Sequence, residues 1–165
     1  GCRAGGGAAV ACGWAAASGR TTSSPGGVGG LGAGKAGVAG LHRLCVGWMT
    51  GAVARDTTTY ARFTDVVADG FALISPGGTA TGRGALIAEL EAAHGQRAAF
   101  DIWIADCRCR WSAGDLCLIT YEEWQQTGEV KTGRLSTALF RRRAAAPNGV
   151  EWLHVHETWL PGAAP

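Results

Sequence analysis

Three early segments of the chain carry apolar residues at the three- and four-residue spacing of an amphipathic helix. They lie within residues 41–50, 57–69 and 82–94, and a glycine follows each segment. Glycine is a common helix stop, because it adopts the left-handed conformation without strain. The pattern predicts three N-terminal helices. Their apolar faces comprise Leu41, Leu44, Cys45, Trp48 and Met49; Tyr60, Phe63, Val66 and Val67; and Leu86, Ile87 and Leu90.

The pattern then changes to the two-residue alternation of β-strands. After a short strand predicted at residues 71–75, four long segments follow the third helix, at residues 98–111, 115–126, 133–143 and 150–160. Short turns that contain Gly114, Gly128 and Gly149 separate these segments, which favours an antiparallel meander. We therefore predict an α+β fold, with three N-terminal helices packed on a curved antiparallel sheet of four long strands plus a short one.

Residues 1–40 differ in composition from the rest of the chain. They contain 14 glycines and 10 alanines but no acidic residue. Such a segment loses much conformational entropy on ordering and has few side chains to bury, so we predict a disordered Gly/Ala-rich tail. The composition also fits an organelle transit segment or a misdefined start. The folded domain is then expected to span residues 41–161.

Within this segment, residues 29–36 read GGLGAGKA and resemble the phosphate-binding P-loop G-x-x-x-x-G-K-[ST]. Ala36 stands where the motif needs a hydroxyl group for a magnesium ion, and the preceding TTSSPGGV contains no apolar strand. A working P-loop follows a buried strand and opens a helix whose N-terminus faces the phosphates. We interpret the run as a chance match at a domain boundary and expect no cofactor.

Charge and cysteine content narrow the classes of function. The net charge is +2, and the five basic residues that precede Asp56 are scattered. Nucleic-acid binding relies on dense basic patches and a membrane span on about 20 apolar residues, so we expect neither partner. The six cysteines indicate free thiols in a soluble protein of a reducing compartment, cytoplasmic or organellar. A thiolate site of Cys107, Cys109 and Cys117 is the alternative.

The last two predicted strands carry a recognisable ending. RLSTALFRRR and GVEWLHVHETWLPG contain Thr137, Phe140, Arg141, Arg142, Trp152, His154 and His156. With this ending and the order of helices and strands, residues 41–161 resemble the nuclear transport factor 2-like (NTF2-like) superfamily. The similarity is to its SnoaL-like and calcium/calmodulin-dependent kinase association-domain branches. The resemblance implies a cystatin-type cone with a pocket between the concave sheet face and the helices. Because this fold hosts unrelated activities, it implies a fold rather than a reaction.

The resemblance also implies which side chains face the pocket. On the last strand Leu153, Val155, Glu157 and Trp159 are expected inside, and Trp152, His154 and His156 outside, on a dimer surface. On the two preceding strands the expected inward set is Leu118, Thr120, Glu122, Trp124, Arg134, Ala138 and Phe140, with Tyr121 outside. The expected ligand pocket comprises Tyr60, Phe63, Leu118, Thr120, Trp124, Phe140, Val155 and Trp159.

Two interpretations of this pocket stay open. Glu122 and Glu157 form either a carboxylate pair with a raised pKa, suited to proton abstraction, or structural ion pairs with Arg134. We favour a domain that binds a small apolar or carboxylate ligand, forms a homodimer, or both, without catalysis. The alternative is a pocket enzyme of isomerase, dehydratase or cyclase type, with Glu122 or Glu157 as general base on an apolar carbonyl compound. His154 and His156 show no third ligand nearby, so no metal is expected.

Overall fold

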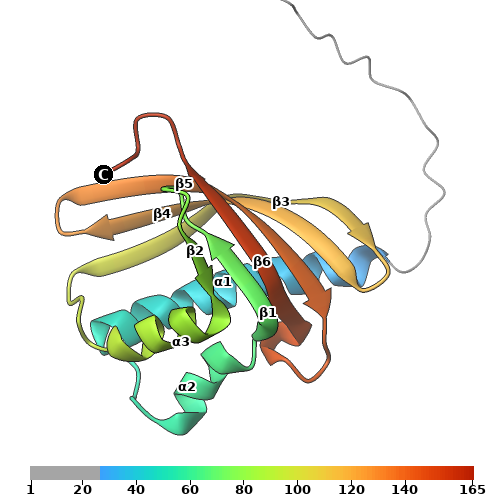
Figure 1. Cartoon of the computed structure of the whole chain (residues 1–165), viewed down its shortest axis with the longest axis horizontal. Helices are drawn as coiled ribbons and strands as arrows, with labels where there is room; N and C mark the ends of the chain where they lie inside the picture. Colours follow the sequence, from blue (N-terminus) through green and yellow to red (C-terminus); the bar gives the residue numbers. More distant parts are fainter. Residues whose placement is uncertain (1–26) are drawn as a thin grey trace, which may run out of the picture.

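The computed structural model describes residues 27–165, in which three α-helices pack against a six-stranded sheet (Figure 1). The helices are α1 (Gly27–Thr50), α2 (Thr57–Thr64) and α3 (Arg83–Ala92). The strands are β1 (Val67–Ile74), β2 (Ala80–Gly82), β3 (Phe100–Ala113), β4 (Leu116–Thr127), β5 (Val130–Arg142) and β6 (Val150–Trp159). A short 3-10 helix, η1 (Pro147–Gly149), precedes β6.

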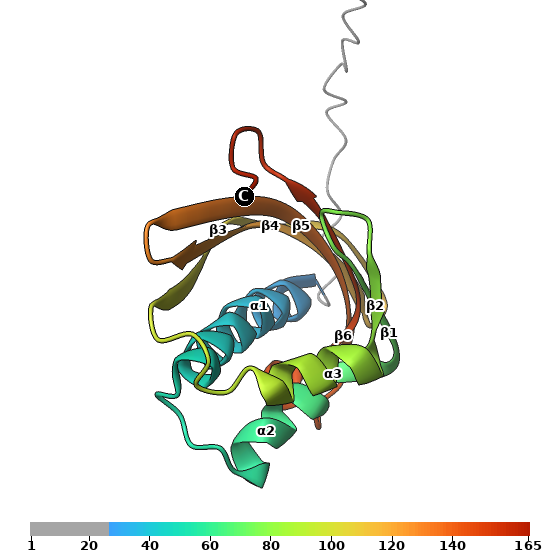
Figure 2. The same ribbon diagram turned by 60° about the vertical axis from the view of Figure 1, so that its left-hand side comes forward.

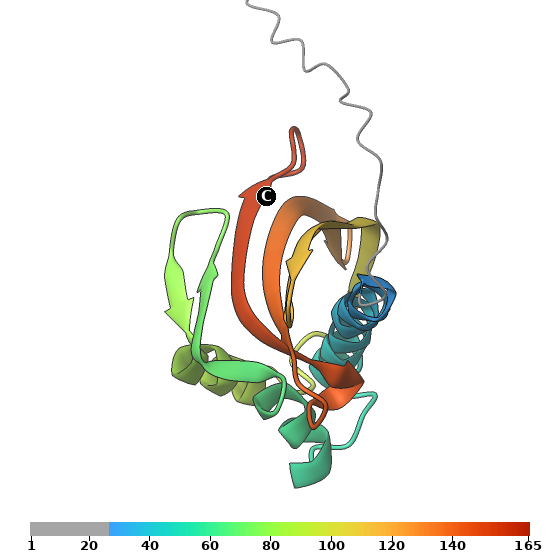
Figure 3. The same cartoon turned by 90° about the vertical axis from the view of Figure 1, so that its right-hand side faces the viewer.

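The sheet curves around α1, so that sheet and helices enclose the interior of a cone (Figure 2). α1 runs along β3 and β4, whereas α3 packs beneath β1 at the other side of the sheet (Figure 3). The α+β class and the packing of helices on one curved face agree with the prediction.

The sheet is mixed, with the strand order β2-β1-β6-β5-β4-β3. The four long strands form the predicted antiparallel meander. β1, however, pairs with β6 in the parallel direction, with Leu73 opposite Val155, and β2 adds a second short strand. The prediction of a purely antiparallel sheet is wrong, because alternation reports the faces of a strand and not its direction.

α1 begins at Gly27, so the predicted disordered tail is wrong for residues 27–40, whereas residues 1–26 lie outside the described residues. Gly34 and Gly37 are buried against the sheet, and a Cβ atom on Gly37 would lie 2.6 Å from Cγ2 of Val150. Glycine permits this close approach. The run GGLGAGKA lies inside the continuous helix and not in a loop that opens one, and Lys35 is exposed. This geometry does not match a P-loop.

α2 is shorter than the pattern predicts. Its N-cap is Asp56, whose carboxylate accepts a hydrogen bond from the backbone N of Thr59 at 2.7 Å. The helix ends at Thr64. The buried Val66 lies just before β1, and the buried Val67 is the first residue of β1. Two adjacent β-branched residues favour extended backbone, which explains why the predicted helical continuation is wrong.

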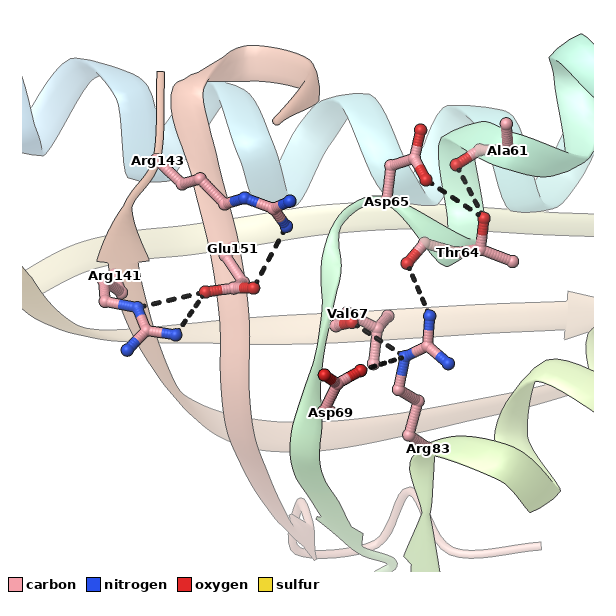
Figure 4. A network of polar contacts seen from close by, with 9 residues as sticks. All are labelled: Ala61, Thr64, Asp65, Val67, Asp69, Arg83, Arg141, Arg143 and Glu151. Carbon is pink, nitrogen blue, oxygen red and sulfur yellow. Dashed lines mark hydrogen bonds and ion pairs between the residues drawn. The ribbon is translucent and has the colours of Figure 1, made fainter. Parts of the chain in front are cut away.

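Arg83, the first residue of α3, ties this helix to the junction between α2 and β1 (Figure 4). Its Nε donates to the carbonyl oxygen of Val67 at 3.0 Å, and its Nη2 donates to that of Thr64 at 3.1 Å. Nε also lies 3.8 Å from the carboxylate of Asp69. These contacts fix the helix that closes one side of the cone.

A second arginine network joins β5 to β6 through the buried Glu151 (Figure 4). Arg141 donates from Nε and Nη2 to one carboxylate oxygen of Glu151, at 3.0 and 2.6 Å, and Arg143 donates to the other at 3.2 Å. Arg142 instead reaches the carbonyl oxygen of Gly114 in the β3–β4 turn. The basic run at the end of β5 therefore holds the neighbouring strands together.

Two groups of buried side chains form the core. One lies between the sheet and α1, and includes Val38, Ile119, Tyr121, Ala138, Phe140, Val150, Trp152 and Val155. The other joins α1 to α2 and α3, and consists of Leu44, Trp48 and Phe63. Within residues 27–165, no helix combines the length and apolar character needed to cross a membrane.

Candidate functional site

A cavity of about 110 Å³ lies inside the cone, between the concave sheet face and the helices. A volume of this order holds a molecule about the size of benzene. Four polar side chains line it: His42, Tyr121, Glu123 and Glu157. The rest of the wall is largely apolar and consists of Leu41, Cys45, Phe63, Val67, Phe71, Leu73, Leu86, Leu90, Trp152 and Val155.

His42 of α1 and Glu123 of β4 form a buried pair in this wall. Nε2 of His42 lies 2.9 Å from Oε2 of Glu123. Nδ1 lies 2.7 Å from the carbonyl oxygen of Val38, one turn earlier in α1. A carbonyl oxygen only accepts hydrogen bonds, so Nδ1 carries a proton, and a second proton lies between Nε2 and the carboxylate.

Electrostatics places this second proton on the histidine. Burial raises the pKa of Glu123, but the hydrogen bond and charge of His42, together with Arg134, outweigh burial and lower it to about 2. Burial lowers the pKa of His42, yet the hydrogen bond and charge of Glu123 raise it above 6.5 overall. Below the raised pKa of His42 the pair is an imidazolium and a carboxylate. In this form His42 has no nitrogen free to accept a proton from a ligand.

Arg134 and Ser136 of β5 hold the second carboxyl group of the cavity, Glu157 of β6. Nη1 of Arg134 donates to Oε2 of Glu157 at 3.1 Å, and Oγ of Ser136 donates to Oε1 at 3.3 Å. Nε of Arg134 lies 3.7 Å from Oε1 of Glu123, so this guanidinium stands between both carboxylates. Burial and the charge of Glu123 raise the pKa of Glu157, although Arg134 opposes them.

The different environments of the two carboxyl groups therefore shift their pKa values in opposite directions. Glu123 stays ionised, whereas Glu157 takes up a proton more readily. The phenol of Tyr121 is also buried, and burial together with Glu123 and Glu157 raises its pKa well above the usual value. The cavity thus offers a carboxyl group and a protonated phenol within apolar walls. Among the described residues, no group of three or more His, Cys, Asp or Glu side chains could hold a metal ion.

The predicted inward set on β4 is wrong by one residue. The antiparallel ladder pairs Glu123 with Arg134, and paired residues project from the same face. Glu122 therefore lies on the outer face, where it accepts a hydrogen bond from Nε1 of Trp124 at 3.0 Å, and it cannot pair with Glu157. The outer residues are Leu118, Thr120, Glu122 and Trp124, and the buried inner residues are Cys117, Ile119, Tyr121 and Glu123.

A β-bulge changes the faces of β6. Trp152 lies opposite Phe140 and His154 opposite Leu139, so Leu153 has no partner and the alternation shifts by one residue. Trp152, predicted outside, lines the cavity instead, with its ring 4.5 Å from that of Phe140. Leu153, the unpaired residue of the bulge, does not line the cavity.

Beyond the bulge, the structure places Val155 and Glu157 in the cavity wall, as it does Phe63 of α2. His154 and His156 lie on the outer face, where His154 is half-buried and His156 exposed. The part of these two histidines in a dimer surface stays a prediction.

The other predicted pocket residues do not line the cavity. Tyr60 stacks on Trp48 with ring centroids 5.7 Å apart, and its hydroxyl donates to the carbonyl oxygen of Ile87 at 3.0 Å. Phe140 is fully buried in the core. Trp159 lies beneath the guanidinium of Arg134, whose Cζ is 5.3 Å from the ring centroid. Arg134 acts on the cavity through Glu123 and Glu157.

Sequence reasoning missed His42, Tyr121 and Glu123 as cavity residues. For His42 one signal exists, because it follows Val38 by four residues and precedes Cys45 by three, which places it on the apolar face of α1. An ionisable residue on such a face needs a buried partner, and Glu123 is that partner.

The fold of this chain occurs in solved structures of NTF2-like proteins. One of unknown function from Pseudomonas aeruginosa is 22% identical, with a TM-score of 0.70 over 78% of this chain and 98% of that one. The hub domain of CaMKII (calcium/calmodulin-dependent protein kinase II) from S. rosetta is 16% identical, with a TM-score of 0.57 over 76% of this chain and 95% of that one. A putative association domain of this type II kinase from Thiobacillus denitrificans is 20% identical, with a TM-score of 0.51 over 78% of this chain and 92% of that one. The chain therefore has the NTF2-like fold that its ending predicts.

Residues 40–161 match the family described as "Sucrose-6-phosphate phosphohydrolase C-terminal", and the chain belongs to this family. Two tobacco (Nicotiana tabacum) proteins are similar in sequence. Sucrose-phosphatase 2 is 32% identical over 66 residues, which are 39% of this chain and 16% of that protein. Sucrose-phosphatase 1 is 31% identical over 78 residues, which are 46% of this chain and 18% of that protein. The chain thus matches less than a fifth of these relatives.

Proposed function

We propose that this domain binds a small, uncharged, mostly apolar molecule in the cavity and performs no reaction on it. The supporting observation is the cavity itself, about 110 Å³ in volume, with apolar walls and with Tyr121 and Glu157 as hydrogen-bonding groups. A pocket with a few converging polar groups in an apolar wall is typical of small-ligand sites. The two carboxyl groups disfavour an anion, so the expected ligand carries a hydroxyl or carbonyl group instead of a carboxylate.

Binding is favoured over catalysis because the two candidate acid–base groups of the cavity, Glu157 and His42, already have partners. Both oxygens of Glu157 accept hydrogen bonds, from Arg134 and Ser136. His42 holds two protons and cannot act as a base in that state. The alternative of a pocket enzyme reduces to Glu157 as a general base, with its raised pKa as the one observation in favour.

We do not transfer the phosphatase reaction of the tobacco relatives to this chain. The matched segments are 16% and 18% of those proteins, so their names describe much longer chains. A sugar phosphate is also a poor fit for the cavity. It is far larger than about 110 Å³ allows, and its phosphate would meet Glu123 and Glu157 in apolar surroundings.

The binding proposal is tested with phenol, benzamide and benzoate. Because Trp152 lines the cavity, a bound aromatic molecule is expected to change tryptophan fluorescence and to raise the melting temperature. Phenol and benzamide should bind better than benzoate at pH 7. Val155→Phe should fill the cavity and abolish binding, whereas Leu118→Phe on the outer face should leave it unchanged. Equal binding by the two folded variants, or none by the native chain, would contradict the proposal.

We also propose that the outer sheet face mediates self-association. Leu135, 42% exposed, lies on this face between the neighbouring strands that carry Glu122 and Thr158. Two of the similar structures are a kinase hub domain and a kinase association domain, and these names refer to the assembly of those proteins. Leu135→Lys is expected to convert a dimer to a monomer in sedimentation experiments. Val130→Lys, at a 60% exposed site at the start of β5, is the control and should leave the dimer intact.

A further inference from the structure

Two cysteines lie in sulfur–sulfur contact at the end of the β3–β4 hairpin, away from the polar groups of the cavity. Sγ of Cys109 on β3 is 3.5 Å from Sγ of Cys117 on β4. Both are free thiols in the described structure. The alternative of a thiolate site formed by Cys107, Cys109 and Cys117 is not supported, because no group of three or more His, Cys, Asp or Glu side chains among the described residues could hold a metal ion. The contact is therefore one between a pair of thiols.

Strand pairing explains the contact. Cys109 faces Ile119 across the ladder, and Cys117 lies two residues from Ile119 on the same face of β4. A bulge between Cys109 and Trp111 shifts the register beside the pair. The sulfurs must approach by about 1.5 Å to reach the length of a disulfide bond, about 2.05 Å. Side-chain rotation on two adjacent strands, with the irregular backbone at the bulge, supplies this movement.

We propose that Cys109 and Cys117 are an oxidation site, at which a hydroperoxide converts the thiol pair to an intramolecular disulfide. Cys109 is the accessible partner, since it is half-buried and Cys117 is only 4% exposed. With hydrogen peroxide as the oxidant, the Cys109 thiolate attacks one peroxide oxygen and the O–O bond breaks. The products are a sulfenic acid at Cys109 and one water. The Cys117 sulfur then attacks the sulfenic sulfur and loses its proton, and a second water leaves. Two thiols are oxidised and one peroxide is reduced.

The surroundings favour the disulfide over further oxidation of Cys109. Cys117 is held at contact distance, so it attacks the sulfenic acid within the same molecule. The resolving sulfur also lies under α1, since a Cβ atom on Gly34 would be 3.9 Å from Sγ of Cys117. Burial raises the pKa of Cys117 to about 11, which agrees with Cys109 as the residue that reacts first.

The test is peptide mapping of the full chain after hydrogen peroxide and alkylation of the remaining thiols. Trypsin cuts after Arg108 and Arg110, so it separates Cys107 from Cys109 and leaves Cys109 in a dipeptide. The expected product is this dipeptide linked to peptide 111–131, which carries Cys117. The link should be lost in Cys109→Ser and Cys117→Ser.

Two further variants serve as controls, because their cysteines lie outside the pair. Cys107→Ser and Cys45→Ser should both keep the link, and circular dichroism checks that every variant folds. A disulfide that uses Cys107, sulfinic acid at Cys109 without a link, or no reaction at Cys109 would each overturn the proposal. So would a link in Cys107→Ser that forms more than tenfold slower than in the native chain.

Discussion

Nε2 of His42 lies 2.9 Å from Oε2 of Glu123, although 81 residues separate them in the chain. The contact joins α1 to β4 across the wall of the cavity. Because Nδ1 of His42 donates to the carbonyl oxygen of Val38, the histidine is doubly protonated when Nε2 donates to the carboxylate. The two charges compensate each other in a buried position, and each is costly to keep without the other.

Removing one charge of this pair should destabilise the fold strongly. Glu123→Gln keeps the shape of the side chain but leaves His42 and Arg134 without its negative charge. The pKa of Glu123, lowered from 4.5 to about 2, corresponds to about 3 kcal/mol of stabilisation at neutral pH. We expect the free energy of unfolding in urea at pH 7 to fall by about this amount.

The neighbouring residue provides the control for this experiment. Glu122→Gln changes the same chemical group one residue away, on the half-buried outer face, where Trp124 is the hydrogen-bond donor. Its expected loss is about 1 kcal/mol or less. Equal losses from Glu122→Gln and Glu123→Gln would contradict the assignment of the two faces of β4.

The pair of His42 and Glu123 should stabilise the fold most within a limited range of pH. The folded-state pKa of Glu123 is lowered, so its stabilisation is present above 4.5 and is lost as pH falls toward about 2. The folded-state pKa of His42 is raised, so its stabilisation is present below 6.5 and is lost as pH rises through the raised value. The stability difference between the native chain and Glu123→Gln should therefore be largest between pH 4.5 and 6.5. A difference that grows toward pH 3 in urea titrations would refute this.

Glu157 should have the opposite dependence on pH. Its pKa is raised in the folded state, so the folded chain binds the proton more tightly than the unfolded chain. Stability therefore declines as pH rises from 4.5 through the raised pKa, and Glu157→Gln removes this decline. We expect the unfolding free energy of Glu157→Gln, relative to the native chain, to rise between pH 4 and pH 7. The relative value of Glu122→Gln should show no such rise.

The alternation of the sequence predicts the four long strands, because each is half-buried and carries a clear two-residue period. It does not by itself determine which set of β4 faces inward. The β4–β5 turn does carry that information. Thr127 pairs with Val130 across the two residues Gly128 and Glu129, and Gly128 has a φ of 58°. A two-residue turn joins residues of opposite parity, so an inward Arg134 requires an inward Glu123.

Two other features of the structure, the bulge in β6 and the first part of α1, have no comparable signal in the sequence. The bulge at Leu153 turns Trp152 inward, and nothing in the local spacing of VEWLHVHETW marks it. The glycine-rich segment before Leu41 has the composition of a disordered chain, and its helix depends on packing against strands more than 75 residues away. Composition reports the entropy of ordering such a segment but not the contacts that compensate for it.

Two glycines of α1 test this role of close packing. At Gly32 an added Cβ meets no atom within 4 Å, so Gly32→Ala should stabilise the chain by about 0.5–1 kcal/mol through helix propensity. At Gly37 the Cβ would lie 2.6 Å from Cγ2 of Val150, a side chain that is only 2% exposed and cannot move aside.

Gly37→Ala should therefore destabilise the chain by about 1 kcal/mol, despite the same gain in helix propensity. Thermal and urea unfolding of the two variants should move in opposite directions from the native chain. If both alanines stabilise the protein equally, α1 does not rest on η1 and β6 as closely as Gly37 and Val150 indicate. Gly37→Ser, with a further atom beyond Cβ, should then be tolerated as well, whereas close packing predicts a loss at least as large as that of Gly37→Ala.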